Sequence, residues 1–272
     1  TSPAPGGNDL IIGGAGDDSV YGGLGDNTIF GGDGDDSLFG TFDIGNPGIG
    51  GNNLIDGGNG DDRIFGEQGN DVLRGSDGND VVVGYEGNDL IEGGVGNDDL
   101  SWGSTSAAVG VGRLLGGTDD DVLRGGFATP HMSGGDGNDL LIIGRFEAGR
   151  TQPGILAELD GGAGFDSLDL HVRPSFDLTA AEGQRVSGIE RIDLTSPNAD
   201  AGTNLTLDAP SVLRLSDETD TLRVDGDLND HIFAQGAWMN DGAINVGGAT
   251  YMQWLVNGAA VLVDPDIQFT LF

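Results

Sequence analysis

The sequence predicts an all-β chain that begins as a parallel β-solenoid, with short strands stacked in successive coils, and ends in a β-rich cap. Three observations support this prediction. A nine-residue pattern recurs through residues 1–169, Gly accounts for 53 of the 272 residues, and each repeat has a single large apolar position. One such position in nine cannot cover a helix face, and Gly at this density would destabilise a helix.

The repeat reads Gly-Gly-x-Gly-x-Asp-x-U-x, where U is a large apolar residue. Position six is Asp in eleven of fourteen copies, and position eight is apolar in all fourteen. A solvated, flexible acidic tract has no reason to keep position eight apolar, so the pattern indicates a folded repeat. The copies are residues 4–12, 13–21, 22–30, 31–39, 48–56, 57–65, 66–74, 75–83, 84–92, 93–101, 116–124, 125–133, 134–142 and 161–169.

The pattern also predicts the geometry of one coil. We expect a short strand around position eight, with glycines at positions one, two and four forming a turn that requires positive φ. Two repeats then close one coil, and equivalent residues 18 positions apart lie about 4.8 Å apart in neighbouring strands. The apolar position-eight side chains of the two resulting sheets meet in a thin core.

The charge of the chain excludes several classes of function. The formal net charge is −34, which argues against binding to nucleic acid or to an anionic membrane surface. No apolar run approaches the roughly 18 residues of a membrane-spanning helix. The absence of Cys excludes disulfides and thiolate zinc sites.

Stacking places the position-six carboxylates close together, where like charges repel. Main-chain carbonyls of the glycine turns lie at the same edge, so carboxylate and carbonyl oxygens converge. Such a set of hard oxygen ligands is typical of Ca²⁺, which tolerates irregular geometry better than Mg²⁺. We therefore expect one ion to be shared by repeats two copies apart, as in the pairs Asp18 with Asp36, Asp62 with Asp80, Asp71 with Asp89, and Asp80 with Asp98.

This nonapeptide resembles the calcium-binding repeat of the RTX (repeats-in-toxin) family. The resemblance covers about residues 1–169 and implies a right-handed parallel β-roll, roughly 6–10 bound Ca²⁺ ions, and export by type I secretion. It also implies side-chain ligands at position six and main-chain carbonyl ligands near positions two and four. The metal ligands predicted in this way are Asp9, Gly14, Gly16, Asp18, Gly23, Gly25, Asn27, Gly32, Gly34, Asp36, Asn53, Gly58, Gly60, Asp62, Gly69, Asp71, Gly78, Asp80, Gly87, Asp89, Gly94, Gly96, Asp98, Asp119, Asp121, Gly135, Gly137, Asp139, Gly164 and Asp166.

Some copies depart from the pattern. Position two is occupied by Glu67, Ser76 and Tyr85, for which positive φ costs more than for Gly. Asn27 and Asn53 can ligate with less charge, whereas Pro130 offers no side-chain ligand and predicts a vacant site in 125–133. Asp119 replaces Gly at position four and predicts a distorted site. Three insertions interrupt the repeats, at about 40–47, 102–115 and 143–160, and we expect them to leave the solenoid as loops.

Residues 170–272 hold only nine of the 53 glycines and form short alternating runs, so we predict an all-β module that caps the solenoid. The expected strands include 192–194, 205–207, 213–215, 222–224 and 244–246, and Asn257-Gly258 predicts a hairpin turn. Segments 186–194 and 222–230 look similar to the C-terminal regions of large type I-secreted adhesins. Residues 264–272 resemble a type I secretion signal, although a closing edge strand would have the same pattern.

We predict that the chain is not an enzyme, because it lacks the G-x-S-x-G and H-E-x-x-H motifs and its three His residues are isolated. The predicted function is a secreted bacterial calcium-binding module. It folds on Ca²⁺ outside the cell or at the cell surface, as a monomer, and supports type I secretion and folding of a longer parent chain with upstream domains. Two alternatives remain: an adhesin or carbohydrate-binding module that contacts a glycan or cell surface, and an accessory module of a secreted polysaccharide-modifying enzyme.

Overall fold

The protein is described by a computed structural model that covers residues 6–41, 50–102, 112–125, 131–143, 158–170, 175–180, 185–195, 202–216 and 219–272. Most of the three predicted insertions, and Pro130, lie outside these residues. The chain forms two compact units, residues 1–139 and 140–272, and each is described by itself. The compositional boundary near residue 170 falls inside the second unit and stays a prediction.

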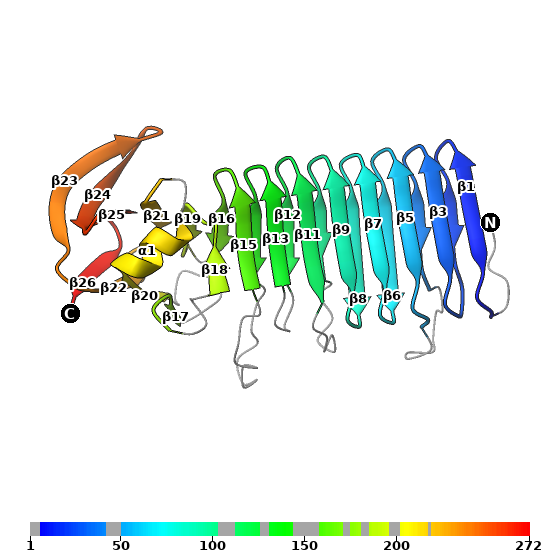
Figure 1. The fold of residues 1–272 in the computed structure, drawn as a ribbon, viewed down its shortest axis with the longest axis horizontal. Helices are drawn as coiled ribbons and strands as arrows, with labels where there is room; N and C mark the ends of the chain where they lie inside the picture. Colours follow the sequence, from blue (N-terminus) through cyan, green and yellow to red (C-terminus); the bar gives the residue numbers. More distant parts are fainter. Residues whose placement is uncertain are drawn as a thin grey trace. The chain divides into compact units, whose positions relative to one another are not determined.

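The first unit is built from two parallel sheets, as the nonapeptide pattern predicts (Figure 1). Chain segments alternate between the sheets, so each coil contributes one strand to each. One sheet contains β1 (Leu10–Ala15), β3 (Thr28–Asp33), β5 (Leu54–Asn59), β7 (Val72–Asp77), β9 (Leu90–Val95), β11 (Arg113–Thr118) and β13 (His131–Asp136). The other contains β2 (Ser19–Tyr21), β4 (Ser37–Phe39), β6 (Arg63–Gln68), β8 (Val81–Glu86), β10 (Asp99–Ser101) and β12 (Val122–Gly125).

The strand register keeps each repeat position in its own column. Ile55 pairs with Leu73, and Leu73 pairs with Ile91, so position eight stacks on position eight. These side chains are completely buried, whereas Leu10 and Ile12 on β1 are exposed. The predicted parallel β-roll is confirmed, and its core is the single apolar column of each sheet.

In the second unit most strands are also parallel. β14 (Leu140–Ile143), β16 (Ser167–Asp169), β19 (Arg191–Asp193), β21 (Thr221–Asp225) and β25 (Ala259–Val263) follow one another in a sheet that ends in the antiparallel strands β24 (Ala249–Val256) and β23 (Met239–Val246). A parallel pair joins β15 (Glu158–Ala163) and β18 (Val186–Ser187). A four-stranded parallel sheet contains β17 (Ser175–Asp177), β20 (Asn204–Asp208), β22 (His231–Gln235) and β26 (Gln268–Leu271).

Several expectations for this half are confirmed and one is wrong. The hairpin between β24 and β25 forms, with Asn257 and Gly258 both at positive φ. Residues 213–215, however, belong to helix α1 (Ala209–Leu215) instead of a strand. Asp208 caps this helix: its side chain accepts a hydrogen bond from Ser211 N, and its own N–H donates to Ser211 Oγ. Within the described residues, no helix has the length and apolar character needed to cross a bilayer.

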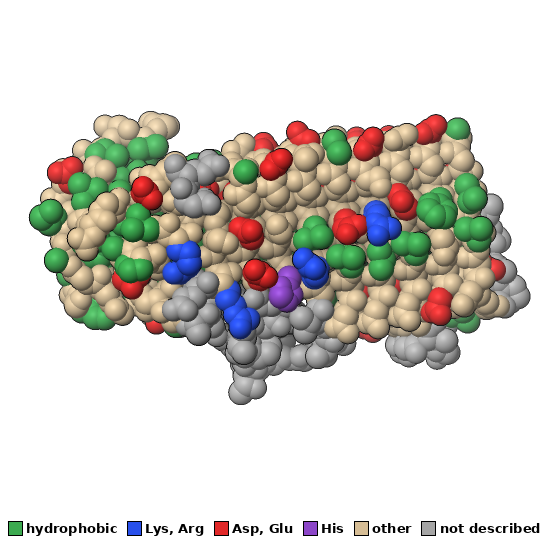
Figure 2. Space-filling view, in the orientation of Figure 1, with side chains coloured by type: hydrophobic (Ala, Val, Ile, Leu, Met, Phe, Trp, Pro, Cys, Tyr) green, Lys and Arg blue, Asp and Glu red, His purple; other side chains and the backbone are tan. Residues whose placement is uncertain are grey.

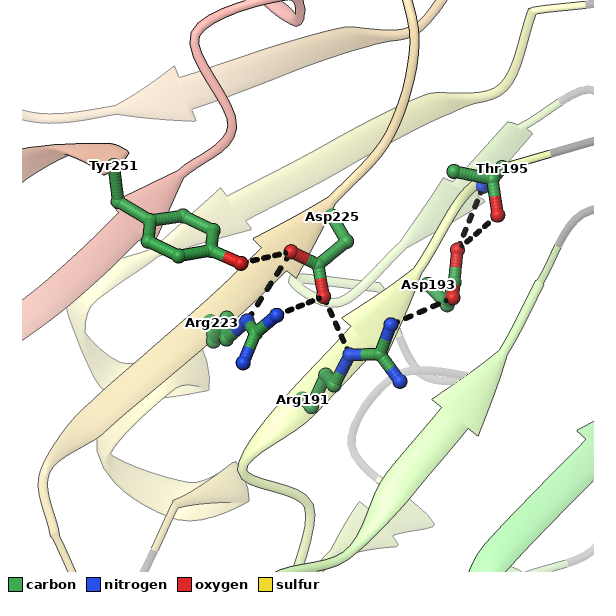
Figure 3. Close-up of polar contacts among 6 residues, drawn as sticks. All are labelled: Arg191, Asp193, Thr195, Arg223, Asp225 and Tyr251. Carbon is green, nitrogen blue, oxygen red and sulfur yellow. Dashed lines mark hydrogen bonds and ion pairs between the residues drawn. The ribbon is translucent and has the colours of Figure 1, made fainter. Parts of the chain in front are cut away.

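An ion-pair network joins three strands of the second unit (Figure 3). The Asp225 carboxylate on β21 accepts hydrogen bonds from Arg191 on β19, Arg223 on its own strand, and Tyr251 on β24, the last at 2.7 Å. Burial alone would raise the pKa of Asp225, but the hydrogen bonds from Tyr251, Arg191 and Arg223 outweigh it and lower the pKa. This carboxylate is therefore ionised and satisfied by protein groups alone.

We predict that Asp225→Ala lowers the free energy of unfolding by about 3 kcal/mol, because Arg223 and the buried Tyr251 hydroxyl lose their acceptor and Arg191 keeps only Asp193. Urea unfolding followed by circular dichroism at constant Ca²⁺ measures this change. The matched control is Asp241→Ala, an exposed carboxylate on β23, which we expect to change stability by less than about 0.5 kcal/mol. Equal effects of the two substitutions would contradict a stabilising role for the network.

Candidate metal centres

The position-six residues form two columns along the turns of the first unit. The long column precedes the even-numbered strands and consists of Asp18, Asp36, Asp62, Asp80, Asp98, Asp121 and Asp139. The short column precedes the odd-numbered strands and consists of Asp9, Asn27, Asn53, Asp71 and Asp89. Strand register alone explains both columns, because equivalent residues of successive coils lie beside one another.

One oxygen of each side chain holds the coil before it. The Asp62 N–H donates to Asp80 Oδ1 at 2.8 Å, and the Asp71 N–H donates to Asp89 Oδ1 at 2.9 Å. The same bond, 2.7–3.1 Å long, links every neighbouring pair in both columns. The structure therefore brings together all four pairs that the sequence analysis expects to share an ion.

The second carboxylate oxygen is buried and has no hydrogen-bond donor. This holds for Oδ2 of Asp36, Asp62, Asp71, Asp80, Asp89, Asp98 and Asp121. These residues are only 1–3% exposed, so water does not solvate the oxygen either. A buried charged oxygen without a partner is strongly unfavourable, and a row of them requires a proton or a cation at each.

Each position-six residue is one rung of its column. Burial is the main cause of the raised pKa values in both columns, and neighbouring carboxylates raise the pKa further at several rungs. The pKa of Asp71 rises to about 8, although hydrogen bonds from Asn53 oppose the shift. The pKa rises to about 7 for Asp62, Asp80 and Asp121, and to about 6 for Asp89, Asp98 and Asp139. Near neutral pH each buried carboxylate of the metal-free columns is thus either protonated and neutral, or charged and repelled by its neighbours.

Glycine at position one is required for space, and the expectation of positive φ there is wrong. A Cβ on Gly75 would overlap Asp80 Oδ2 and the Gly93 carbonyl oxygen, and its φ lies outside the left-handed region. The same two kinds of atom lie beside Gly31, Gly57 and Gly116. Any larger residue would fill the space beside the unpaired oxygen.

Positions two and four do require positive φ. Gly58 and Gly60 have φ of 111° and 124°, and the non-glycine residues of these positions share the conformation, at 75° in Glu67, 86° in Ser76, 72° in Tyr85 and 79° in Asp119. A Cβ on Gly58 would overlap the carbonyl oxygen of Gly32, and one on Gly78 that of Gly60. The carbonyls predicted as ligands therefore line the turns one coil apart.

The position-six carboxylates and the turn carbonyls are ligands that suit a Ca²⁺ ion. All are oxygens, and the carboxylates have one oxygen to spare. Among the described residues no group of three acidic or His side chains converges, so each centre would combine two position-six side chains with main-chain carbonyls. The side chain of Asp119 is exposed and accepts a hydrogen bond from Thr118 Oγ1, whereas its main-chain carbonyl oxygen lines the turn beside Gly137.

Two features were missed from the sequence. In the second unit Asp166 donates its N–H to Glu190 Oε2 at 2.9 Å, so Glu190 acts as a position-six residue in a coil without the nonapeptide. Position five is Asn or Asp in twelve of fourteen copies and forms a second, exposed ladder. Its bonds run in the opposite direction: Asn79 N donates to Asp61 Oδ1, and Asn97 N to Asn79 Oδ1. The composition of that column was the available signal.

Among the described residues, no basic side chain contacts the unpaired carboxylate oxygens from Asp36 to Asp121. Arg74 pairs with Glu92, and Arg124 with Asp99, on the outer faces of the sheets instead of in the position-six columns. The face seen in Figure 2 likewise carries few basic side chains. Protons or external cations are therefore left to compensate the charge of these carboxylates.

Comparison with known proteins agrees with this geometry. A family model described as the RTX calcium-binding nonapeptide repeat (4 copies) matches residues 6–40, 48–73, 66–100 and 110–141. A search of curated proteins finds no match to the chain.

The raised pKa values predict how the calcium-free protein responds to pH. The folded columns hold protons up to pH of about 6–8, whereas an unfolded Asp releases its proton near 3.8, so folding takes up protons between these values. The calcium-stripped protein should therefore gain β-structure as pH falls from 8 to 5 and lose it as pH rises. Far-UV circular dichroism measures this change.

The calcium-saturated protein provides the control. There the sign should reverse, because protons displace the cation and stability falls on acidification. A calcium-free protein whose β-content rises with pH would contradict the described environment of the carboxylates.

Proposed function

The chain belongs to the RTX calcium-binding repeat family, and from this premise we propose that it is a module that folds when Ca²⁺ binds outside the cell and thereby supports type I secretion and folding of a larger protein. The matched repeats are a structural calcium-binding module, and such repeats are typical of secreted proteins. We infer in addition that folding takes place outside the cell and that it assists the export and folding of the larger protein.

The observation that carries the proposal is the row of buried, unpaired Oδ2 atoms from Asp36 to Asp121. Their raised pKa values mean that the folded roll disfavours the charged state that these side chains would have at neutral pH in an unfolded chain. A cation bound between rungs removes this penalty. Folding and calcium binding are therefore coupled, since the site exists only when the coils are stacked.

Without calcium the unfolded chain is favoured. A net charge of −34 opposes compaction, and one buried apolar side chain per repeat provides little hydrophobic stabilisation in return. An extended polyanion is also the form that can thread through a narrow export channel. Low calcium inside the cell and higher calcium outside would then restrict folding to the far side of the membrane.

The expected energies are sufficient for such a switch. Extracellular calcium modules bind with Kd of about 10⁻⁴–10⁻³ M, and at ten times Kd one site contributes about 1.4 kcal/mol. Several sites along the long column therefore contribute a free energy comparable with the stability of one whole domain, about 5–15 kcal/mol. The transition should be cooperative, because each cation links two coils.

We predict a cooperative change from coil to β-structure when Ca²⁺ is titrated into the chelated protein, with a midpoint in the sub-millimolar to millimolar range. Mg²⁺ should not replace Ca²⁺, because it demands octahedral geometry and gives up its water reluctantly. Far-UV circular dichroism with parallel Ca²⁺ and Mg²⁺ titrations at fixed ionic strength measures both. A β-rich spectrum that chelation leaves unchanged would refute calcium-driven folding.

A further inference from the structure

At two rungs of the short column an Asn side chain replaces Asp, so that an amide takes the place of the carboxylate. Asn27 and Asn53 are 1% and 3% exposed, as deeply buried as the Asp residues of the other rungs. Their Oδ1 atoms perform the same task as a carboxylate Oδ1: Asp9 N donates to Asn27 at 3.0 Å, and Asn27 N donates to Asn53 at 3.1 Å. The ladder of hydrogen bonds from main-chain N–H groups to position-six side chains therefore continues through both residues.

The amide nitrogen occupies the place of the unpaired carboxylate oxygen. A Cβ on Gly31 would contact Asp36 Oδ2, and a Cβ on the equivalent Gly22 would lie 2.8 Å from Asn27 Nδ2. A Cβ on Gly40 would likewise lie 2.6 Å from Asn53 Nδ2. An N–H donor thus faces the region where an Asp rung presents a bare oxygen.

That nitrogen is engaged with oxygens of the turn. Asn27 Nδ2 donates to the carbonyls of Gly25, at 3.1 Å, and Gly40, at 3.3 Å. Asn53 Nδ2 donates to the carbonyl of Gly51 at 3.0 Å and to Asp71 Oδ1 at 3.1 Å. Gly25 and Gly51 are position-four residues, whose carbonyls are expected to bind the cation in Asp rungs. The amide therefore uses the oxygens that a cation would need.

The opposite amide orientation is disfavoured by the ladder. Rotating Asn27 by half a turn would free its oxygen to bind a cation, but it would place the NH₂ group against the Asp9 N–H, donor against donor. The same conflict would arise between Asn53 and the Asn27 N–H. The ladder thus fixes both amides with their hydrogens directed at the turn oxygens.

We propose that the amides of Asn27 and Asn53 take the place of bound calcium, so that the short column needs no metal at these two positions. This inference rests on the proposed calcium binding of the Asp rungs. The two edges of the roll are then unequal: the long column needs cations from Asp36 to Asp121, whereas the short column needs them only around Asp71 and Asp89.

The test compares two full-length double variants with the natural chain. Asn27→Asp with Asn53→Asp restores carboxylates in the short column, and the matched control, Asp62→Asn with Asp80→Asn, inserts amides in the long column. Native mass spectrometry across a Ca²⁺ titration counts the bound ions. We expect the first variant to bind one or two more ions than the natural chain, and the second to bind fewer.

Hydrogen exchange of the natural chain gives a second readout that needs no variant, at a Ca²⁺ concentration that keeps the roll folded but leaves some Asp rungs without an ion. The main-chain N–H groups of Asp9 and Asn27 should exchange more slowly than those of Asp62 and Asp80, which donate to carboxylates that lack a cation. Equal exchange of the two sets would overturn the inference, whether or not the variants fold.

The ion counts separate the two levels of the account. If the natural chain and Asn27→Asp with Asn53→Asp bind the same number of ions, the inference is wrong while calcium binding stands. If the natural chain binds no Ca²⁺, the proposed function and the inference both fail.

Discussion

The burial of a carboxylate oxygen without a donor is the constraint on which the rest of this structure depends. Each position-six Asp from Asp36 to Asp121 uses Oδ1 to accept a hydrogen bond from the coil before it and keeps Oδ2 inside the turn, facing a position-one glycine. Parallel stacking repeats this arrangement every coil, so the same register that buries the apolar column also aligns the charges. The fold cannot keep one without the other, so a proton or a cation must neutralise each buried carboxylate.

Glycine has two separate roles around these oxygens. At positions two and four it provides positive φ, and Glu67, Ser76 and Tyr85 show that the turn keeps this conformation even where a side chain makes it costly. At position one it provides room beside the carboxylate, which no other residue type could leave. In the second unit, the Asp225 network with Arg191, Arg223 and Tyr251 satisfies a buried carboxylate by ion pairing and requires no metal.

The columns at positions six and eight could be predicted because a period of nine residues determines which side chains share an edge. Register then follows, and with it the pairs that share a rung. The period does not reveal what the second side-chain atom contacts. The difference between Asn27, which presents an N–H donor, and Asp36, which presents an unpaired oxygen, is therefore visible only in the structure. Helix α1 was missed because Leu213-Arg214-Leu215 suits a strand as well as a helix, and its cap at Asp208 was decisive. Glu190 was missed because Arg185 and Val186 replace the glycines of positions one and two in its copy, although Gly188 remains at position four.

The central claim is that the unpaired Oδ2 atoms of the long column hold cations. Anomalous diffraction from crystals grown in Ca²⁺, or soaked in a lanthanide, tests this most directly. The account predicts peaks between successive rungs from Asp36 to Asp121, each bounded by two carboxylates and turn carbonyls, with none beside Asn27. A folded roll without anomalous peaks at those rungs would mean that protons alone neutralise the buried carboxylates, and it would contradict the account.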